Sequence, residues 1–84
     1  MPETVELNIP VHLRAGTLLR HYKGGLYRVE GACLIEATLE TGILYRPQQG
    51  GATDVLWMRP AAAFDELVET ELGPVRRFSA LQQA

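Results

Sequence analysis

The stretch that most constrains the fold of this chain covers residues 18–31 and has the form of a β-hairpin. Its two halves are rich in apolar and aromatic residues, and they flank the sequence Lys23-Gly24-Gly25. A glycine pair between two β-prone segments predicts a tight turn, because the turns that suit a hairpin need positive φ at their central residues. We therefore expect an antiparallel strand pair here, with positive φ at both Gly24 and Gly25.

A two-residue glycine turn also sets the register of the hairpin. Tyr22 would face Tyr27 and Arg20 would face Val29, and side chains alternate between the two faces of the ribbon. The face expected to join the core carries Leu18, Arg20, Tyr22, Tyr27, Val29 and Cys33.

Arg20 is the single charge on this expected core face. A buried guanidinium without a partner is costly, so Arg20 needs a carboxylate or several carbonyl groups. Asp65 and Glu66 are the candidate partners, in a planar pair that suits arginine. The alternative is that Arg20 lines a cleft with free donors, where it would bind an anion.

The rest of the chain predicts further short strands. With the two strands of the hairpin, at about 17–23 and 26–34, we expect strands at 42–46, 55–59 and 75–80, and one or two helical turns over 61–68. The segment 55–59 is almost wholly apolar and is expected at the centre of the sheet. The prediction is a mainly β fold, either a small SH3-like barrel or a strongly bent antiparallel sheet with one short helical turn.

The predicted organisation is a single β domain over residues 16–81, with an N-terminal arm or edge strand over 1–15 and a tail over 82–84. The chain has 84 residues, a net charge of −2 and a single cysteine. A lone cysteine cannot form an internal disulfide, which fits a reducing cytoplasm. No apolar run is long enough to cross a bilayer, and the acidic N-terminus is unlike a signal peptide, so no membrane association is expected.

The residue types that carry catalysis or bind metals do not combine here into a site. Cys33 and His21 project from opposite faces of the predicted hairpin, so a thiol and its base would not meet. Together with His12, they also lack the paired spacing of a structural zinc site. We expect no catalytic residue, no metal and no cofactor, and we favour a protein that is not an enzyme.

Aromatic residues stand next to cations at several places in the sequence, as they do in grooves that bind single-stranded nucleic acid. Alternation along strands produces the same pattern when aromatics face inward and cations outward, and Trp57 is favoured as a core residue. An acid-free strip around the hairpin turn is the best place for an anionic partner. The candidate ligand-binding residues are Arg20, His21, Tyr22, Lys23, Arg28, Tyr45, Trp57 and Arg59.

Three blocks of sequence resemble a small bacterial family, domain-of-unknown-function family 1653. The blocks are Arg20-His21-Tyr22-Lys23-Gly24 with Tyr27 and Val29; Leu44-Tyr45-Arg46 with Leu56-Trp57-Met58-Arg59-Pro60 and Phe64; and Pro74-Val75-Arg76-Arg77-Phe78. The resemblance implies a compact, mostly β fold and no settled activity. The family commonly has a His-Ser-Glu-Thr-like run after its second strand, whereas residues 35–38 of this chain read Ile-Glu-Ala-Thr and lack the histidine.

From the sequence we expect a non-catalytic binding module, whose partner is an unknown protein or an anionic ligand, with nucleic acid less favoured. The chain is expected to be a monomer or a weak homodimer. The alternative is a small enzyme or ligand sensor with a pocket near Arg20, Tyr45, Trp57 and Arg59. A deep polar pocket with convergent side chains would favour that alternative.

Overall fold

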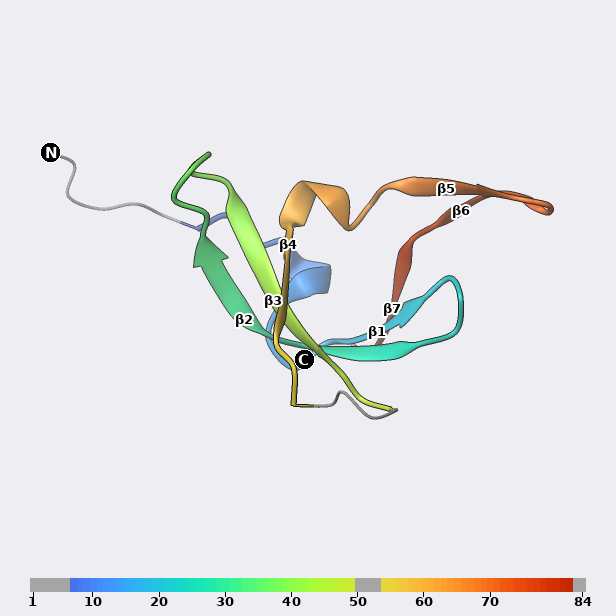
Figure 1. The fold of residues 1–84 in the computed structure, drawn as a ribbon, viewed down its shortest axis with the longest axis horizontal. Coiled ribbons are helices and arrows are strands. Elements are labelled where there is room, and N and C mark those ends of the chain that lie inside the picture. Colours follow the sequence, from blue (N-terminus) through green and yellow to red (C-terminus); the bar gives the residue numbers. More distant parts are fainter. Residues whose placement is uncertain (1–6, 50–53, 83–84) are drawn as a thin grey trace, which may run out of the picture.

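The computed structural model describes residues 7–49 and 54–82 of the chain, which form a mainly β structure, as expected (Figure 1). The strands are β1 (Leu18–His21), β2 (Leu26–Leu34), β3 (Thr41–Pro47), β4 (Trp57–Pro60), β5 (Leu67–Thr70), β6 (Gly73–Arg76) and β7 (Phe78–Gln82). Two single turns of 3-10 helix, η1 (Val11–Leu13) and η2 (Ala61–Ala63), complete the described elements.

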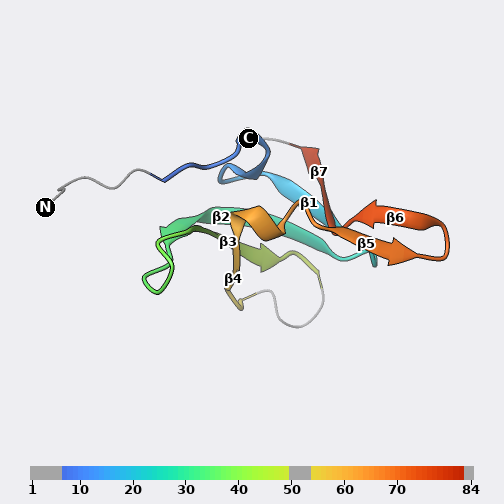
Figure 2. The same ribbon diagram turned by 90° about the horizontal axis from the view of Figure 1, so that it is seen from above.

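Five of the strands form one antiparallel sheet in the order β4-β3-β2-β1-β7, and it curls strongly into a half-barrel. The register shifts between Val29 and Gly31 on β2 and between Leu18 and Leu19 on β1. Such bulges bend a strand and increase its twist, which explains the curl. The strands β5 and β6 pair as a separate ribbon that extends away from the curled sheet (Figure 2).

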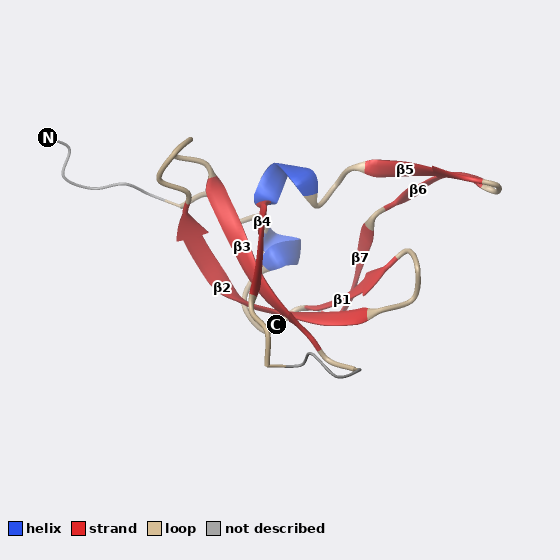
Figure 3. Ribbon diagram, viewed as in Figure 1, coloured by secondary structure: helices blue, strands red, loops and turns tan. Residues whose placement is uncertain are grey.

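The core fills the concave inner face of the sheet. Both 3-10 turns lie on this side (Figure 3). Leu13 in η1 and Phe64 after η2 are each 1% exposed. The ring of Phe64 packs against those of Tyr45 and Phe78, with centroids 5.3 and 4.9 Å apart. The buried apolar residues are Leu13, Leu19, Val29, Ile43, Tyr45, Phe64 and Phe78.

The predicted register of the hairpin is wrong. Leu19 pairs with Tyr27, and Arg20 pairs with Leu26, because the turn is longer than two residues. The N–H of His21 donates to the carbonyl of Gly25 at 2.8 Å, which closes the turn. An odd shift in register moves every side chain of one strand to the other face. Leu19 therefore joins the core in place of Arg20, which spares the fold a buried charge.

Gly24 has a φ of 104° and Gly25 does not have a positive φ, so the expectation holds for only one of the two glycines. A Cβ on Gly24 would meet no atom within 4 Å, so the cost of a substitution there is conformational. We expect Gly24→Ala to destabilise the protein by about 1–2 kcal/mol in chemical denaturation. Gly31→Ala is the matched control, because a Cβ there is equally free and φ is not positive. Equal stability of the two variants would contradict this assignment.

Three other expectations about elements are corrected by the structure. The apolar strand β4 lies at the edge of the sheet, not at its centre, and Trp57 is 50% exposed, so its assignment to the core is wrong. The expected helical stretch over 61–68 is one 3-10 turn followed by β5. The last expected strand, 75–80, is divided at Arg77 between β6 and β7. The glycine-rich composition of residues 47–54 predicts a mobile loop, and residues 50–53 of this segment lie outside the described residues.

Candidate functional site

The candidate residues from the sequence divide between the two faces of the sheet. Arg20 and Arg28 lie on the convex outer face and are exposed. Arg28 lies 3.8 Å from Glu30, and Arg46 lies 3.7 Å from the same carboxylate oxygen. Within the described residues, Arg20 forms no ion pair with Asp65 or any other acid, so its expected pairing at the core margin is wrong.

The other candidates from the strands lie on the inner face. His21 pairs with Phe78 of β7, Trp57 of β4 pairs with Tyr45, and Arg59 follows Trp57 by two positions. Tyr45 is 8% exposed, so it belongs to the core and not to a binding surface. The pocket expected near Arg20, Tyr45, Trp57 and Arg59 is not formed as a unit, because Arg20 faces the opposite side of the sheet.

Four basic side chains gather at one end of the inner face. We name this group the basic cluster: His21 at the end of β1, Lys23 in the turn, Arg59 on β4 and Arg77 between β6 and β7. The guanidinium carbon of Arg59 lies 5.8 Å from the centre of the Phe78 ring, and the ring of His21 lies 5.1 Å from the same ring. The Phe78 ring is therefore the apolar surface that His21 and Arg59 share.

Glu66, just before β5, is the carboxylate shared by the two arginines of the cluster. Its Oε1 atom lies 3.8 Å from Nη1 of Arg59 and 3.4 Å from Nε of Arg77. The Arg77 backbone also donates to the carbonyl of Glu66 at 2.9 Å and accepts from the N–H of Tyr22 at 2.9 Å. These backbone bonds fix Arg77 between the ribbon and the turn that carries Lys23.

One carboxylate does not neutralise these cations. Both contacts to Glu66 are ion pairs by distance, but the Nε atoms of Arg59 and Arg77 are buried and have no hydrogen-bond acceptor among the described residues. Three permanent cations against one carboxylate leave an excess of two positive charges when His21 is neutral. Both guanidinium side chains are 29% exposed, so the cluster presents this charge to solvent.

The pKa of His21 reflects the same excess of positive charge. Burial, followed by the charges of Arg77, Lys23 and Arg59, lowers the pKa of His21 below the usual 6.5. Its Nδ1 accepts a hydrogen bond from the N–H of Lys23 at 3.2 Å. In the neutral ring, the proton is then on Nε2, which is available as a donor.

The lowered pKa of His21 predicts how stability depends on pH. Below pH 6.5 the unfolded chain takes up a proton at this histidine while the folded protein still resists it, so stability should fall as the pH is lowered through this range. The measurement is the free energy of unfolding from urea denaturation at several pH values from about 7.5 down to about 5, the range in which histidine titrates. His21→Gln should show a shallower dependence than the wild type, and identical slopes would contradict the assignment.

Comparison with known proteins identifies the family. The family model described as a protein of unknown function (DUF1653) matches residues 17–80 of this chain. The chain belongs to the DUF1653 family. A crystal structure of a DUF1653 protein from Bordetella bronchiseptica is similar, with 30% sequence identity and a TM-score of 0.71. The match covers 84% of this chain and 90% of that one. No curated protein matches the chain.

Two central residues of the site in this DUF1653 member were not among the predicted ligand-binding residues. Glu66 was considered as a partner for Arg20, and Arg77 was noted in the last block of resemblance and as a cation next to an aromatic residue. The one available signal was that Arg77 immediately precedes an aromatic residue, as cations do elsewhere in the chain. Its contact with Glu66 depends on the break between β6 and β7, which the sequence did not reveal.

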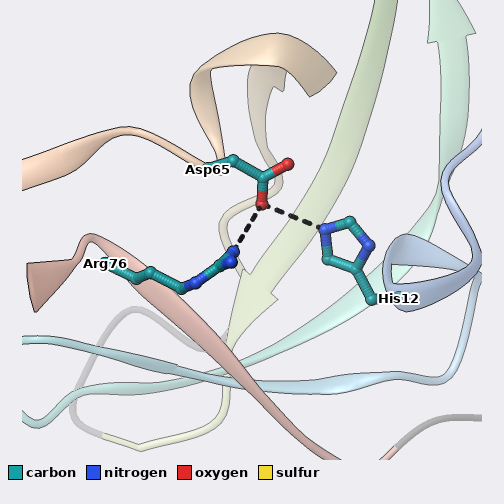
Figure 4. Close-up of polar contacts among 3 residues, drawn as sticks. All are labelled: His12, Asp65 and Arg76. Atoms are coloured by element: carbon teal, nitrogen blue, oxygen red, sulfur yellow. Dashed lines mark hydrogen bonds and ion pairs between the residues drawn. The ribbon is translucent and has the colours of Figure 1, made fainter.

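A second polar group lies away from the basic cluster. Asp65 Oδ1 accepts hydrogen bonds from His12 Nε2 at 3.1 Å and from Arg76 Nη1 at 3.3 Å (Figure 4). These side chains line a cavity of about 440 Å³ together with Phe78, Ser79 and Ala80. All three members of the group are more than a third exposed, and the carboxylate oxygen is already shared by two donors. We interpret the group as a link between η1 and the ribbon.

The described residues contain no group of three or more His, Cys, Asp and Glu side chains that could hold a metal ion. Cys33 and His21 lie near opposite ends of β2: Cys33 is within that strand, and the N–H of His21 bonds to Gly25 just before it. Among residues 7–49 and 54–82, no helix is long and apolar enough to cross a membrane.

Proposed function

We propose that this protein is a small non-catalytic binding module that holds an anionic group of its ligand or partner at the basic cluster. The observation that carries the proposal is the shared carboxylate of Glu66, which contacts Arg59 and Arg77 without a hydrogen bond to either side chain. The guanidinium side chains of Arg59 and Arg77 are also partly exposed, and exposed guanidinium groups are suited to an incoming carboxylate or phosphate.

A binding role is favoured over the alternative of a small enzyme or ligand sensor. General acid–base catalysis needs titratable groups that converge on an enclosed pocket. The two cavities characterised in the described residues are lined by other side chains than Arg20, Tyr45, Trp57 and Arg59. The side chains of the cluster are instead partly exposed, which suits recognition of a charged group.

The setting in which the module would act is part of the same proposal. A single cysteine, which forms no internal disulfide, favours a reducing compartment such as the cytoplasm, and the family resemblance favours a bacterial source. The curled sheet is comparable in size to SH3-like modules, which bind ligands on an open surface. We propose a monomer or weak homodimer.

The test is a titration with inorganic phosphate at low ionic strength, followed through backbone amide shifts in NMR. Lys23→Gln, Arg59→Gln and Arg77→Gln should each weaken binding about tenfold, the effect expected for losing one charged hydrogen bond. Lys23 is exposed, so its variant should fold normally and keeps the test valid if an arginine variant is destabilised.

Arg20→Gln and Arg28→Gln are matched controls, because they remove the same charge from the outer face. These variants should change the affinity less than about twofold, through the general charge of the protein alone. Weakening of equal size in all variants, or no phosphate binding by the wild type, would overturn the proposal.

A further inference from the structure

We propose that the anion held by the basic cluster is the phosphate of a nucleotide, and that Trp57 stacks on its base. This inference rests on the proposed function and adds the chemical class of the ligand. It joins an exposed aromatic side chain to the cationic site through a single strand, β4.

The strand β4 presents Trp57 and Arg59 on the same face. Trp57 pairs with Tyr45 and Arg59 pairs with Ile43, and both of these partners are buried on the inner face. Side chains two positions apart on a strand are separated by about 6.5 Å. The ribose of a nucleotide places its phosphate and its base at a comparable separation, so both groups can be contacted together.

The exposure of Trp57 supports a role in binding. It is the single tryptophan of the chain and is 50% exposed, although a small domain needs its large apolar side chains for the core. An aromatic ring beside a cation is the combination that proteins use to hold a base and its phosphate. The ring therefore has free surface, and it stands two positions from Arg59 on the same face of β4.

The charge of the cluster distinguishes between nucleotide ligands. A phosphate monoester carries a charge of about −1.5 to −2 at pH 7, which balances the excess of two positive charges counted over the basic cluster and Glu66. A phosphodiester within a strand carries one charge. The outer-face cations Arg20 and Arg28 point away from Trp57 and do not extend the cluster into a track for a long strand. The structure thus favours a free nucleotide or a phosphorylated strand end.

Because Trp57 is the sole tryptophan, its fluorescence reports on this position alone. We would titrate the protein with adenosine 5′-monophosphate, guanosine 5′-monophosphate, ribose 5-phosphate and adenosine, and measure affinities by calorimetry in parallel. The nucleotides should quench Trp57 and bind about tenfold or more tightly than ribose 5-phosphate, which has no base to stack. Trp57→Leu should reduce the affinity for the nucleotides to that for ribose 5-phosphate, which it should leave unchanged.

The controls separate this inference from the function on which it rests. Equal binding of ribose 5-phosphate and the nucleotides, unaffected by Trp57→Leu, would overturn the stacking and leave an anion-binding module. Absence of binding by all phosphates would overturn both. Adenosine binding as tightly as its monophosphate would overturn the role of the cluster in holding the phosphate.

A dinucleotide with and without a 5′-phosphate tests the preference for a monoester. The phosphorylated form should bind about tenfold more tightly, as one additional charged contact predicts. Equal affinity would contradict the preference and point to recognition of phosphodiesters within a strand.

Discussion

Phe64→Ala is expected to destabilise the protein by about 3–5 kcal/mol, the usual loss when a buried phenylalanine is truncated. Phe64 is 1% exposed, and its ring packs against those of Tyr45 and Phe78 over the inner face of the sheet. A chain of 84 residues has a total stability of only about 4–13 kcal/mol, so this loss is a large fraction of the total.

Urea denaturation of Phe64→Ala measures this effect, with Leu72→Ala as the control. Leu72 lies at the tip of the ribbon and is 95% exposed, so its truncation should change stability by less than about 0.5 kcal/mol. A loss of less than about 1 kcal/mol for Phe64→Ala would contradict the packing of the core described above.

Glu66→Gln should move stability and affinity in opposite directions. Losing the half-exposed carboxylate removes ion pairs to Arg59 and Arg77, at up to about 1 kcal/mol each. The same change removes a negative charge that competes with an incoming anion, so phosphate should bind about tenfold more tightly. A purely structural role for Glu66 would reduce stability without raising affinity.

Glu30→Gln is the matched control for this prediction. Glu30 also lies between two arginines, Arg28 and Arg46, but on the outer face of the sheet. The variant removes the same charge, so it should have a similar small effect on stability and change phosphate affinity less than about twofold. A comparable gain in affinity for the two variants would show that net charge alone governs binding.

The strand β2 shows what the sequence could predict. Its observed bounds, Leu26–Leu34, coincide with the expected range, because a β-prone segment that directly follows a glycine turn is a strong local signal. The mainly β fold and strong bending of the sheet follow from several such segments in a short chain. These features depend on residues close in sequence.

The face of β1 that joins the core shows where prediction from local sequence fails. Leu18 and Leu19 are adjacent, so alternation along this strand is compatible with either face toward the core. The choice agrees with the longer hairpin turn and with pairing to β7, about 60 residues away in the chain, where the register shifts between the same two leucines. Long-range pairing of this kind leaves no local pattern, and the face assigned to Arg20 was therefore wrong.

The basic cluster could be predicted only in part, because some of its contacts also join segments that are distant in the sequence. His21 and Lys23 were singled out because they lie in the acid-free strip around the turn, and Arg59 because it follows Trp57 by two positions. The contact between Glu66 and Arg77 arises where the ribbon leaves the sheet, at the break between β6 and β7. The position of such a break depends on tertiary packing and could not be inferred from residue types.

The measurement that tests the central claim most directly is the pKa of His21, obtained by NMR titration with and without saturating inorganic phosphate. Burial and the cations Arg77, Lys23 and Arg59 lower this pKa in the free protein, so an anion bound among them should raise it. Chloride at matched ionic strength controls for screening. The account predicts a higher pKa in phosphate than in chloride, and an unchanged pKa at saturation would contradict binding at the basic cluster.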